Sequence, residues 1–91
     1  MIVKVYMRPE CHLCEEAVAG LGKLRDEFPE LELTEVDIDG DEQLFLRYLE
    51  RIPVIEAGGA IISEIFFEPD VVRAALAELD TGTPGSRGQV R

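Results

Sequence analysis

The alternation of apolar and polar residues divides the chain into short segments of recognisable period. Residues 1–7 (MIVKVYM) are mostly apolar and β-branched or aromatic, which is typical of a buried strand. From Cys11 the apolar residues recur at helical spacing, which predicts a helix that Pro29 ends. Gly20 and Gly22 lie within it, and each weakens the helix by about 1 kcal/mol relative to alanine. The apolar positions of this helix are Leu13, Ala17, Leu21, Leu24 and Phe28.

A second strand and a short helix follow. Residues 31–39 (LELTEVDID) predict the strand, and a break in their alternation allows either a bulge or an edge position. Asp39-Gly40-Asp41 then supplies a turn and a candidate N-cap. The next segment, 42–50, predicts a helix whose apolar residues are Leu44, Phe45, Tyr48 and Leu49.

A hairpin and a last helix complete the pattern. Two apolar runs, 52–57 and 60–66, are joined by Gly58-Gly59, and both glycines tolerate the positive φ of a tight hairpin turn. Pro69 suits the first turn of the last helix, and Asp70 is favourable at its positive end. The predicted inner face of that helix consists of Val72, Ala75, Leu76 and Leu79.

These segments predict an α/β fold with the order βαβ-α-ββα. The first three elements form a βαβ unit with parallel strands and a right-handed crossover. The hairpin adds antiparallel strands, which gives a four-stranded mixed sheet with helices on both faces. The last stretch (DTGTPGSRGQVR) holds turn formers and almost no apolar residues, so we expect a domain over 1–79 and a disordered tail over 80–91.

Composition limits the class of protein. The 91 residues, of which 46% are apolar, suffice for one small globular domain. A net charge of −10 argues against nucleic acid or an anionic membrane as the main partner. The sequence has neither a signal-peptide pattern nor a membrane-length apolar run, so we expect a cytoplasmic protein. We also expect it to be a monomer. We assign the aromatic residues Tyr6, Tyr48, Phe66 and Phe67 to the core or its rim.

The segment RPECHLCEEA contains both cysteines, Cys11 and Cys14, and the only histidine, His12. In a reducing cytoplasm a C-x-x-C pair is more often catalytic or metal-binding than a structural disulfide. Three interpretations are therefore open: a redox pair, ligands of zinc or an iron–sulfur cluster shared between chains, and two small buried apolar residues.

The predicted elements place Cys11 where the first strand gives way to the first helix. Unpaired N–H groups and the helix dipole favour an anion there. In C-x-x-C motifs such surroundings lower the pKa of a thiol to about 3.5–7.5. We therefore expect Cys11 to be the exposed nucleophile and Cys14, one turn further on, to be the resolving thiol.

Three sequence features together resemble the thioredoxin-like superfamily: CHLC after the first strand, EVDID closing the second, and RIPVI opening the third. The short form, without an extra N-terminal strand, is similar to a glutaredoxin and closest to a bacterial glutaredoxin-like subgroup. This resemblance covers residues 1–79. It implies that Pro53 is cis and faces the cysteines, which leaves the Ile52 backbone free to pair with a substrate peptide.

Basic residues beside the cysteines have two interpretations each. Arg8 either pairs with the Cys11 thiolate or neutralises Glu10, and His12 either stabilises the thiolate as imidazolium or is a solvated spacer. Arg51 stands where the family often has a basic residue that helps to bind glutathione or the thiolate, so the resemblance implies a substrate-binding role for it.

Two departures from the glutaredoxin pattern concern glutathione. His12-Leu13 replaces the usual Pro-Tyr between the cysteines. Residues 63–70 lack the glycine pair whose neighbouring backbone amides hold a glutathione carboxylate, and Pro69 has no N–H to donate. Glutathione is thus an expected co-substrate with an incomplete site.

The sequence therefore predicts a thiol–disulfide oxidoreductase that needs no bound cofactor or metal. Its substrate would be a disulfide-containing protein or a small thiol compound, and glutathione or a thioredoxin-reductase-type partner would supply the electrons. Two alternatives use the same chain differently. One is a non-catalytic thioredoxin-fold binding module, and the other is a carrier of a metal ion or an iron–sulfur cluster bound by the two cysteines.

Overall fold

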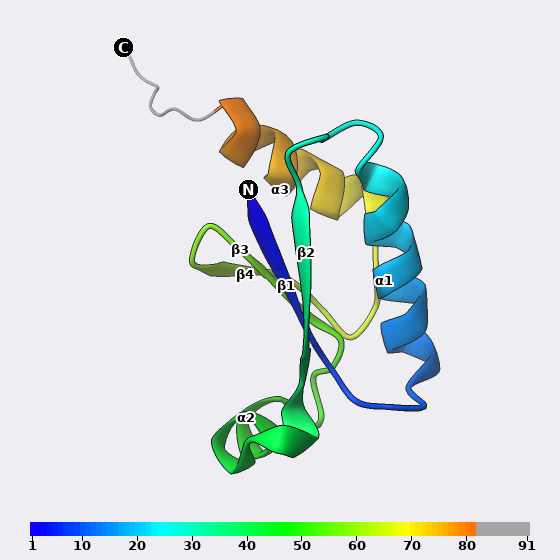
Figure 1. The fold of residues 1–91 in the computed structure, drawn as a ribbon, viewed down its shortest axis with the longest axis vertical. Coiled ribbons are helices and arrows are strands. Elements are labelled where there is room, and N and C mark those ends of the chain that lie inside the picture. Colours follow the sequence, from blue (N-terminus) through cyan, green and yellow to red (C-terminus); the bar gives the residue numbers. More distant parts are fainter. Residues whose placement is uncertain (82–91) are drawn as a thin grey trace.

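The computed structural model describes residues 1–81, and their elements follow the predicted order βαβ-α-ββα (Figure 1). A short 3-10 turn, η1, is the only addition to that order within the described part. The elements are β1 (Ile2–Met7), α1 (His12–Leu24), β2 (Glu32–Asp37), η1 (Ile38–Gly40), α2 (Glu42–Tyr48), β3 (Val54–Ala57), β4 (Ala60–Glu64) and α3 (Pro69–Thr81).

The strands form one mixed four-stranded sheet, as predicted, and their order in it is β2-β1-β3-β4. Strands β1 and β2 are parallel, whereas β3 is antiparallel to both β1 and β4. Tyr6, near the end of β1, lies opposite Val54, the first residue of β3. The segment that leaves β1 and the segment that enters β3 therefore lie at the same end of the sheet.

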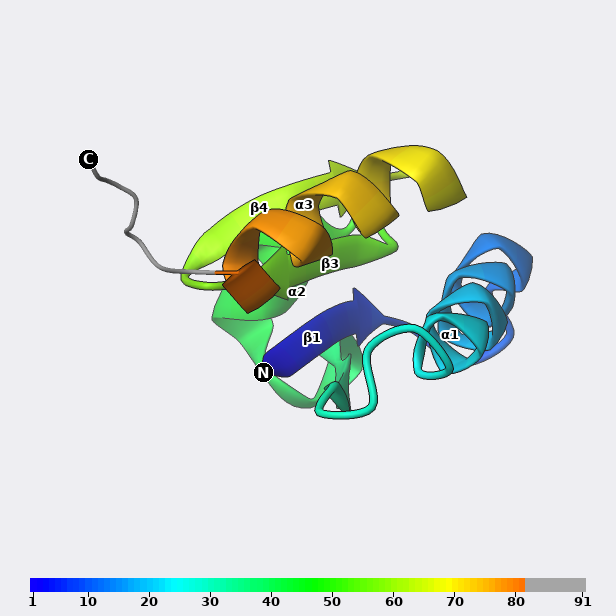
Figure 2. The same cartoon turned by 90° about the horizontal axis from the view of Figure 1, so that it is seen from above.

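Helices cover both faces of the sheet, which confirms the predicted layers (Figures 1 and 2). Helices α1 and α3 pack on one face, where Leu21 and Leu76 contact the core formed by Val3, Val5 and Ile55. Each of these fully buried side chains contributes about 1.5–3 kcal/mol to folding. None of the helices in residues 1–81 is long and apolar enough to cross a membrane.

The other face carries a smaller core. Tyr6 and Val54 pack there against Ile38 of η1 and Tyr48 of α2. Helix α2 has only seven residues and lies beyond the end of the sheet where β1 and β2 finish (Figure 1). The start of β1 on this face is therefore open to solvent, and Ile2 is exposed.

The hairpin between β3 and β4 forms as predicted. Gly58 and Gly59 have φ values of 61° and 79°, a left-handed conformation that glycine adopts without steric cost. The sheet does contain a bulge, but it lies in this hairpin, where the register shifts between Ile55 and Glu56. Strand β2 pairs with β1 without interruption, so its broken alternation reflects its position at the sheet edge.

Three of the predicted segments extend further along the chain than the elements in the structure. Helix α1 ends at Leu24, well before Pro29, although Phe28 is still buried because the following turn folds it back onto the core. The predicted strand over 31–39 ends at Asp37, whose carboxylate accepts a hydrogen bond of 2.9 Å from the Asp39 N–H and so begins η1. The predicted helix over 42–50 ends at Tyr48.

The end of the domain also differs from the prediction. Helix α3 continues to Thr81, two residues past the predicted domain end at 79. Leu79, expected on the inner face, is 42% exposed. Residues 82–91, which make up the rest of the predicted tail, lie outside the described residues.

Candidate functional site

A disulfide joins Cys11 and Cys14 at the start of α1, and their Cα atoms are 5.2 Å apart. Cys11 is the N-cap of the helix, with extended backbone angles (φ −98°, ψ 109°). The Cys14 N–H donates a 3.2 Å hydrogen bond to Cys11 Sγ, and the Glu15 N–H donates to the Cys11 carbonyl at 3.0 Å. The predicted place of Cys11 at the junction of strand and helix is confirmed.

The two sulfur-bearing residues differ in burial. Cys14 has no exposed surface, whereas Cys11 is partly exposed. A reagent in solution therefore meets Cys11 first. The helix N-terminus also places positive partial charge at this sulfur, which favours its thiolate once the disulfide is reduced.

The Ile52–Pro53 peptide bond is cis, as the resemblance implied. A single donor holds the backbone on both sides of this peptide bond. The Ile65 N–H donates to the Arg51 carbonyl and to the Pro53 carbonyl, each at 3.0 Å. Pro53 is fully buried, and Ile52 is half-buried. Within residues 1–81 the Ile52 backbone makes no hydrogen bond, so its N–H and carbonyl are available to a partner.

Backbone strain is concentrated around this end of the sheet. Among the described residues other than glycine, only Glu10 and Ile65 have positive φ, at 61° and 67°. Glu10 directly precedes Cys11, and Ile65 is the residue bonded across to Pro53. Left-handed φ costs a β-branched residue such as Ile65 about 1–2 kcal/mol, and such outliers occur preferentially at functional sites.

The predicted basic residues at this site are each paired with a carboxylate. Arg8 Nε bonds Asp39 Oδ1 at 2.8 Å, and the guanidinium also lies 5.2 Å above the Phe45 ring. His12 Nε2 lies 2.9 Å from Glu16 Oε2. Arg8 is thus paired with Asp39, and no hydrogen bond or ion pair with Cys11 or Glu10 is present in the described chain. The influence of Arg8 and His12 on the Cys11 thiolate stays a prediction.

Arg51 forms a two-point pair with Glu64. Its Nε donates to Oε1 at 3.2 Å, and Nη2 bonds Oε2. This hydrogen bonding holds the pKa of Glu64 below its usual value. Glu64 ends β4 and Arg51 precedes β3, so no local spacing in the sequence connects the two residues. The substrate-binding role of Arg51 stays a prediction.

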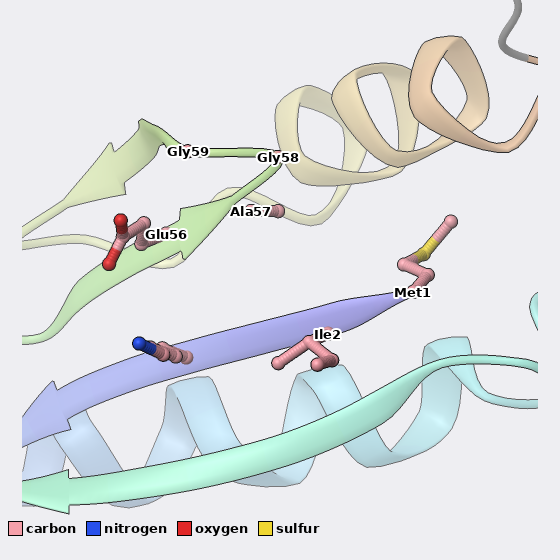
Figure 3. A pocket seen from close by; sticks show the side chains of 7 residues that line it. Met1, Ile2, Glu56, Ala57, Gly58 and Gly59 are labelled. Atoms are coloured by element: carbon pink, nitrogen blue, oxygen red, sulfur yellow. The ribbon is translucent and has the colours of Figure 1, made fainter.

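Other features of the described chain do not add to this site. Within residues 1–81 no group of three or more His, Cys, Asp or Glu side chains is arranged to hold a metal ion. A cavity of about 540 Å³ opens at the start of β1, lined in part by Met1, Glu56 and Gly58 (Figure 3). It lies at the opposite end of β1 from the disulfide.

Both the sheet order and the disulfide at the start of α1 define a thioredoxin-like fold with a C-x-x-C site. The chain belongs to the glutaredoxin-like domain family (DUF836), whose model matches residues 2–77. Among curated proteins no relative matches.

Solved structures support the same assignment. The chain is 32% identical to target protein XcR50 from X. campestris, over 82% of this chain and 95% of that one, with a TM-score of 0.70. It is 38% identical to protein Ne2328 from Nitrosomonas europaea, over 80% of this chain and 87% of that one, with a TM-score of 0.69. A thioredoxin mutant from Halobacterium salinarum shares the fold, with a TM-score of 0.63 and 17% identity over 91% of this chain and 77% of that one.

Proposed function

We propose that this protein is a thiol–disulfide oxidoreductase in which Cys11 is the attacking thiolate and Cys14 the resolving thiol. The observation that carries the proposal is the asymmetry of the pair. Cys11 is the partly exposed N-cap of α1, and Cys14 is fully buried yet within disulfide-bonding distance. Such a pair reacts with an external disulfide through one sulfur and releases the product through the other.

The reaction takes place in two exchange steps. The Cys11 thiolate attacks a substrate sulfur, so that a Cys11–substrate S–S bond forms while the substrate's own S–S bond breaks, and the departing thiolate takes a proton from water. The Cys14 thiolate then attacks Cys11 Sγ and releases the second substrate thiol. The substrate gains two electrons, and the dithiol becomes the observed Cys11–Cys14 disulfide. Two equivalents of an external thiol restore the reduced protein.

Neighbouring groups would support these steps. The Cys14 N–H, which lies 3.2 Å from Cys11 Sγ, would stabilise negative charge on the attacking sulfur. The unpaired Ile52 backbone would align an extended substrate segment beside the cis-Pro53 peptide. We infer that the reaction occurs in the cytoplasm, with electrons from glutathione or a thioredoxin-reductase-type partner.

Single-turnover oxidation tests the proposal. Fully reduced protein is mixed with one equivalent of bis(2-hydroxyethyl) disulfide, a small neutral disulfide, and quenched with acid for mass spectrometry. We expect the intact mass to fall by two hydrogens while two equivalents of 2-mercaptoethanol appear. The double variant C11S/C14S is the control and stays unchanged. Wild-type protein that releases no thiol would overturn the proposal and leave the binding-module interpretation.

A further inference from the structure

The three basic side chains closest in sequence to the cysteines and to the cis-Pro53 peptide each lie against a carboxylate. Arg8 is paired with Asp39, His12 with Glu16, and Arg51 with Glu64. These pairs use part of the hydrogen-bonding capacity of each basic side chain. An anionic ligand would therefore compete with a carboxylate that each of these side chains already holds.

Further carboxylates around Cys11 have no such partner. Glu10 directly precedes Cys11, and Glu15 lies in the first turn of α1; both are exposed. Within the described part of the chain neither carboxylate forms an ion pair. The segment from Arg8 to Glu16, which contains Cys11, thus holds three carboxylates and one guanidinium group, a formal charge of −2 with His12 neutral.

At three positions of the segment that leads into α3 no backbone N–H is free to bind a carboxylate. The Ile65 N–H is used by the Arg51 and Pro53 carbonyls, and the Phe66 N–H bonds the Glu64 carbonyl at 2.7 Å. Pro69, the first residue of α3, has no N–H. In the same turn the Phe66 side chain is 63% exposed, contrary to its predicted place in the core or at its rim, and presents an apolar aromatic face.

Resting on the proposed function of the Cys11–Cys14 pair, we propose that this site selects disulfides carried by cationic partners and discriminates against anionic ones, glutathione disulfide included. The substrate class is a peptide or protein disulfide with Lys or Arg next to its cysteine. Glu10 and Glu15 attract the cation, and the exposed Phe66 ring supplies an aromatic surface against which a cationic stem can lie. The thiol–disulfide exchange itself is the one described above.

Three small disulfides of similar size test this selectivity. Cystamine is dicationic, bis(2-hydroxyethyl) disulfide is neutral and 3,3′-dithiodipropionate is dianionic. Each second-order rate constant for oxidation of the reduced protein is divided by that for free 2-mercaptoethanol, which removes the intrinsic reactivity of the disulfide. We expect a cystamine-to-dithiodipropionate ratio of at least about tenfold at low ionic strength, because each added charge changes the encounter energy by a fraction of a kcal/mol or more.

Added salt and charge-removing substitutions separate the effect of Glu10 and Glu15 from that of the charge of the whole protein. The ratio should fall towards one at about 1 M salt, where the Debye length is only about 3 Å. E10Q/E15Q should lower it several-fold, whereas the matched control E30Q/E32Q, with the same charge change at the far end of β2, should leave it unchanged. E64Q, which frees Arg51, should raise the rate with dithiodipropionate.

The outcomes distinguish this inference from the function on which it rests. If the neutral disulfide oxidises the protein but the normalised ratio is one or inverted, the selectivity is wrong and the oxidoreductase stands. An equal fall in E10Q/E15Q and E30Q/E32Q would also overturn the local origin of the selectivity. If the neutral disulfide fails to react, the proposed function itself fails.

Discussion

The backbone N–H of Cys14 donates a 3.2 Å hydrogen bond to the Sγ of Cys11, across the first turn of α1. This contact ties the two residues of the motif together through backbone as well as through the disulfide. It depends on Cys11 being the N-cap, because only there does a side chain reach the unpaired N–H groups of the helix start. The same position gives Cys11 its exposure and buries Cys14.

The difference in burial predicts the order of alkylation. When the reduced protein is treated with limiting iodoacetamide near neutral pH, Cys11 should be modified at least about tenfold faster than Cys14, since the reagent needs an accessible thiolate. Peptide mapping by mass spectrometry gives the two rates separately. Equal rates would show that the buried position of Cys14 does not persist after reduction.

Alanine substitutions at two glycines of α1 should change the free energy of unfolding in opposite directions. A Cβ at Gly20 would lie 2.2 Å from Cε2 of Phe67, so G20A must displace that ring from its contact with α1. Nothing lies within 4 Å of a Cβ at Gly22, so G22A should stabilise the helix by about 0.5–1 kcal/mol.

Urea unfolding of both variants measures this difference. Overpacking costs about 1–3 kcal/mol, so we expect G20A to be less stable than G22A by at least about 1 kcal/mol. Since both substitutions gain the same helix propensity, G22A serves as the matched control. Equal free energies of unfolding would mean that the Phe67–Gly20 contact is not maintained in solution.

The Tyr6–Glu56 pair predicts a loss of stability at high pH. The Tyr6 hydroxyl donates to Glu56 Oε1 at 2.6 Å, and this bond, together with burial, raises the pKa of Tyr6 to about 12. The folded state thus binds the phenolic proton more tightly than the unfolded state, whose tyrosine titrates near 10. The resulting stabilisation is complete below about pH 10 and is lost as the pH rises towards 12.

Comparison with Y6F isolates that contribution. Below pH 10 the wild type should be more stable than Y6F by about 1.5–3 kcal/mol, the net value of a hydrogen bond to a charged group. The difference should shrink steadily between about pH 10 and 12. A difference that stays constant over this range in urea unfolding would contradict the assignment.

Local signals in the sequence were sufficient for much of the fold. Gly58-Gly59 predicted the hairpin because only left-handed backbone closes so tight a turn. Asp41 was a candidate N-cap, and its carboxylate does accept from the Gln43 and Leu44 N–H groups. Cys11 and Cys14 were placed by the change from strand to helix period. Each of these features is fixed by residues close together in sequence.

Contacts between distant segments could not be predicted in the same way. Asp39 lies far along the chain from Arg8, and Glu64 lies on a different element from Arg51, so no spacing indicated either pair. The packing of Phe67 on Gly20 likewise joins the segment after β4 to α1, positions that are far apart in the sequence. Helix α1 was predicted too long because Phe28 continues the apolar period after the backbone has left the helix.

The central claim, that Cys11 attacks and Cys14 resolves, is tested most directly by trapping the mixed disulfide. Reduced C14S and C11S proteins are each exposed to bis(2-hydroxyethyl) disulfide, quenched with acid and weighed by mass spectrometry. We predict that C14S rapidly accumulates a stable mercaptoethanol adduct on Cys11, whereas C11S, with its one thiol buried, acquires none on the same timescale. An adduct that forms equally fast on Cys14 of C11S, or not at all on Cys11 of C14S, would contradict it.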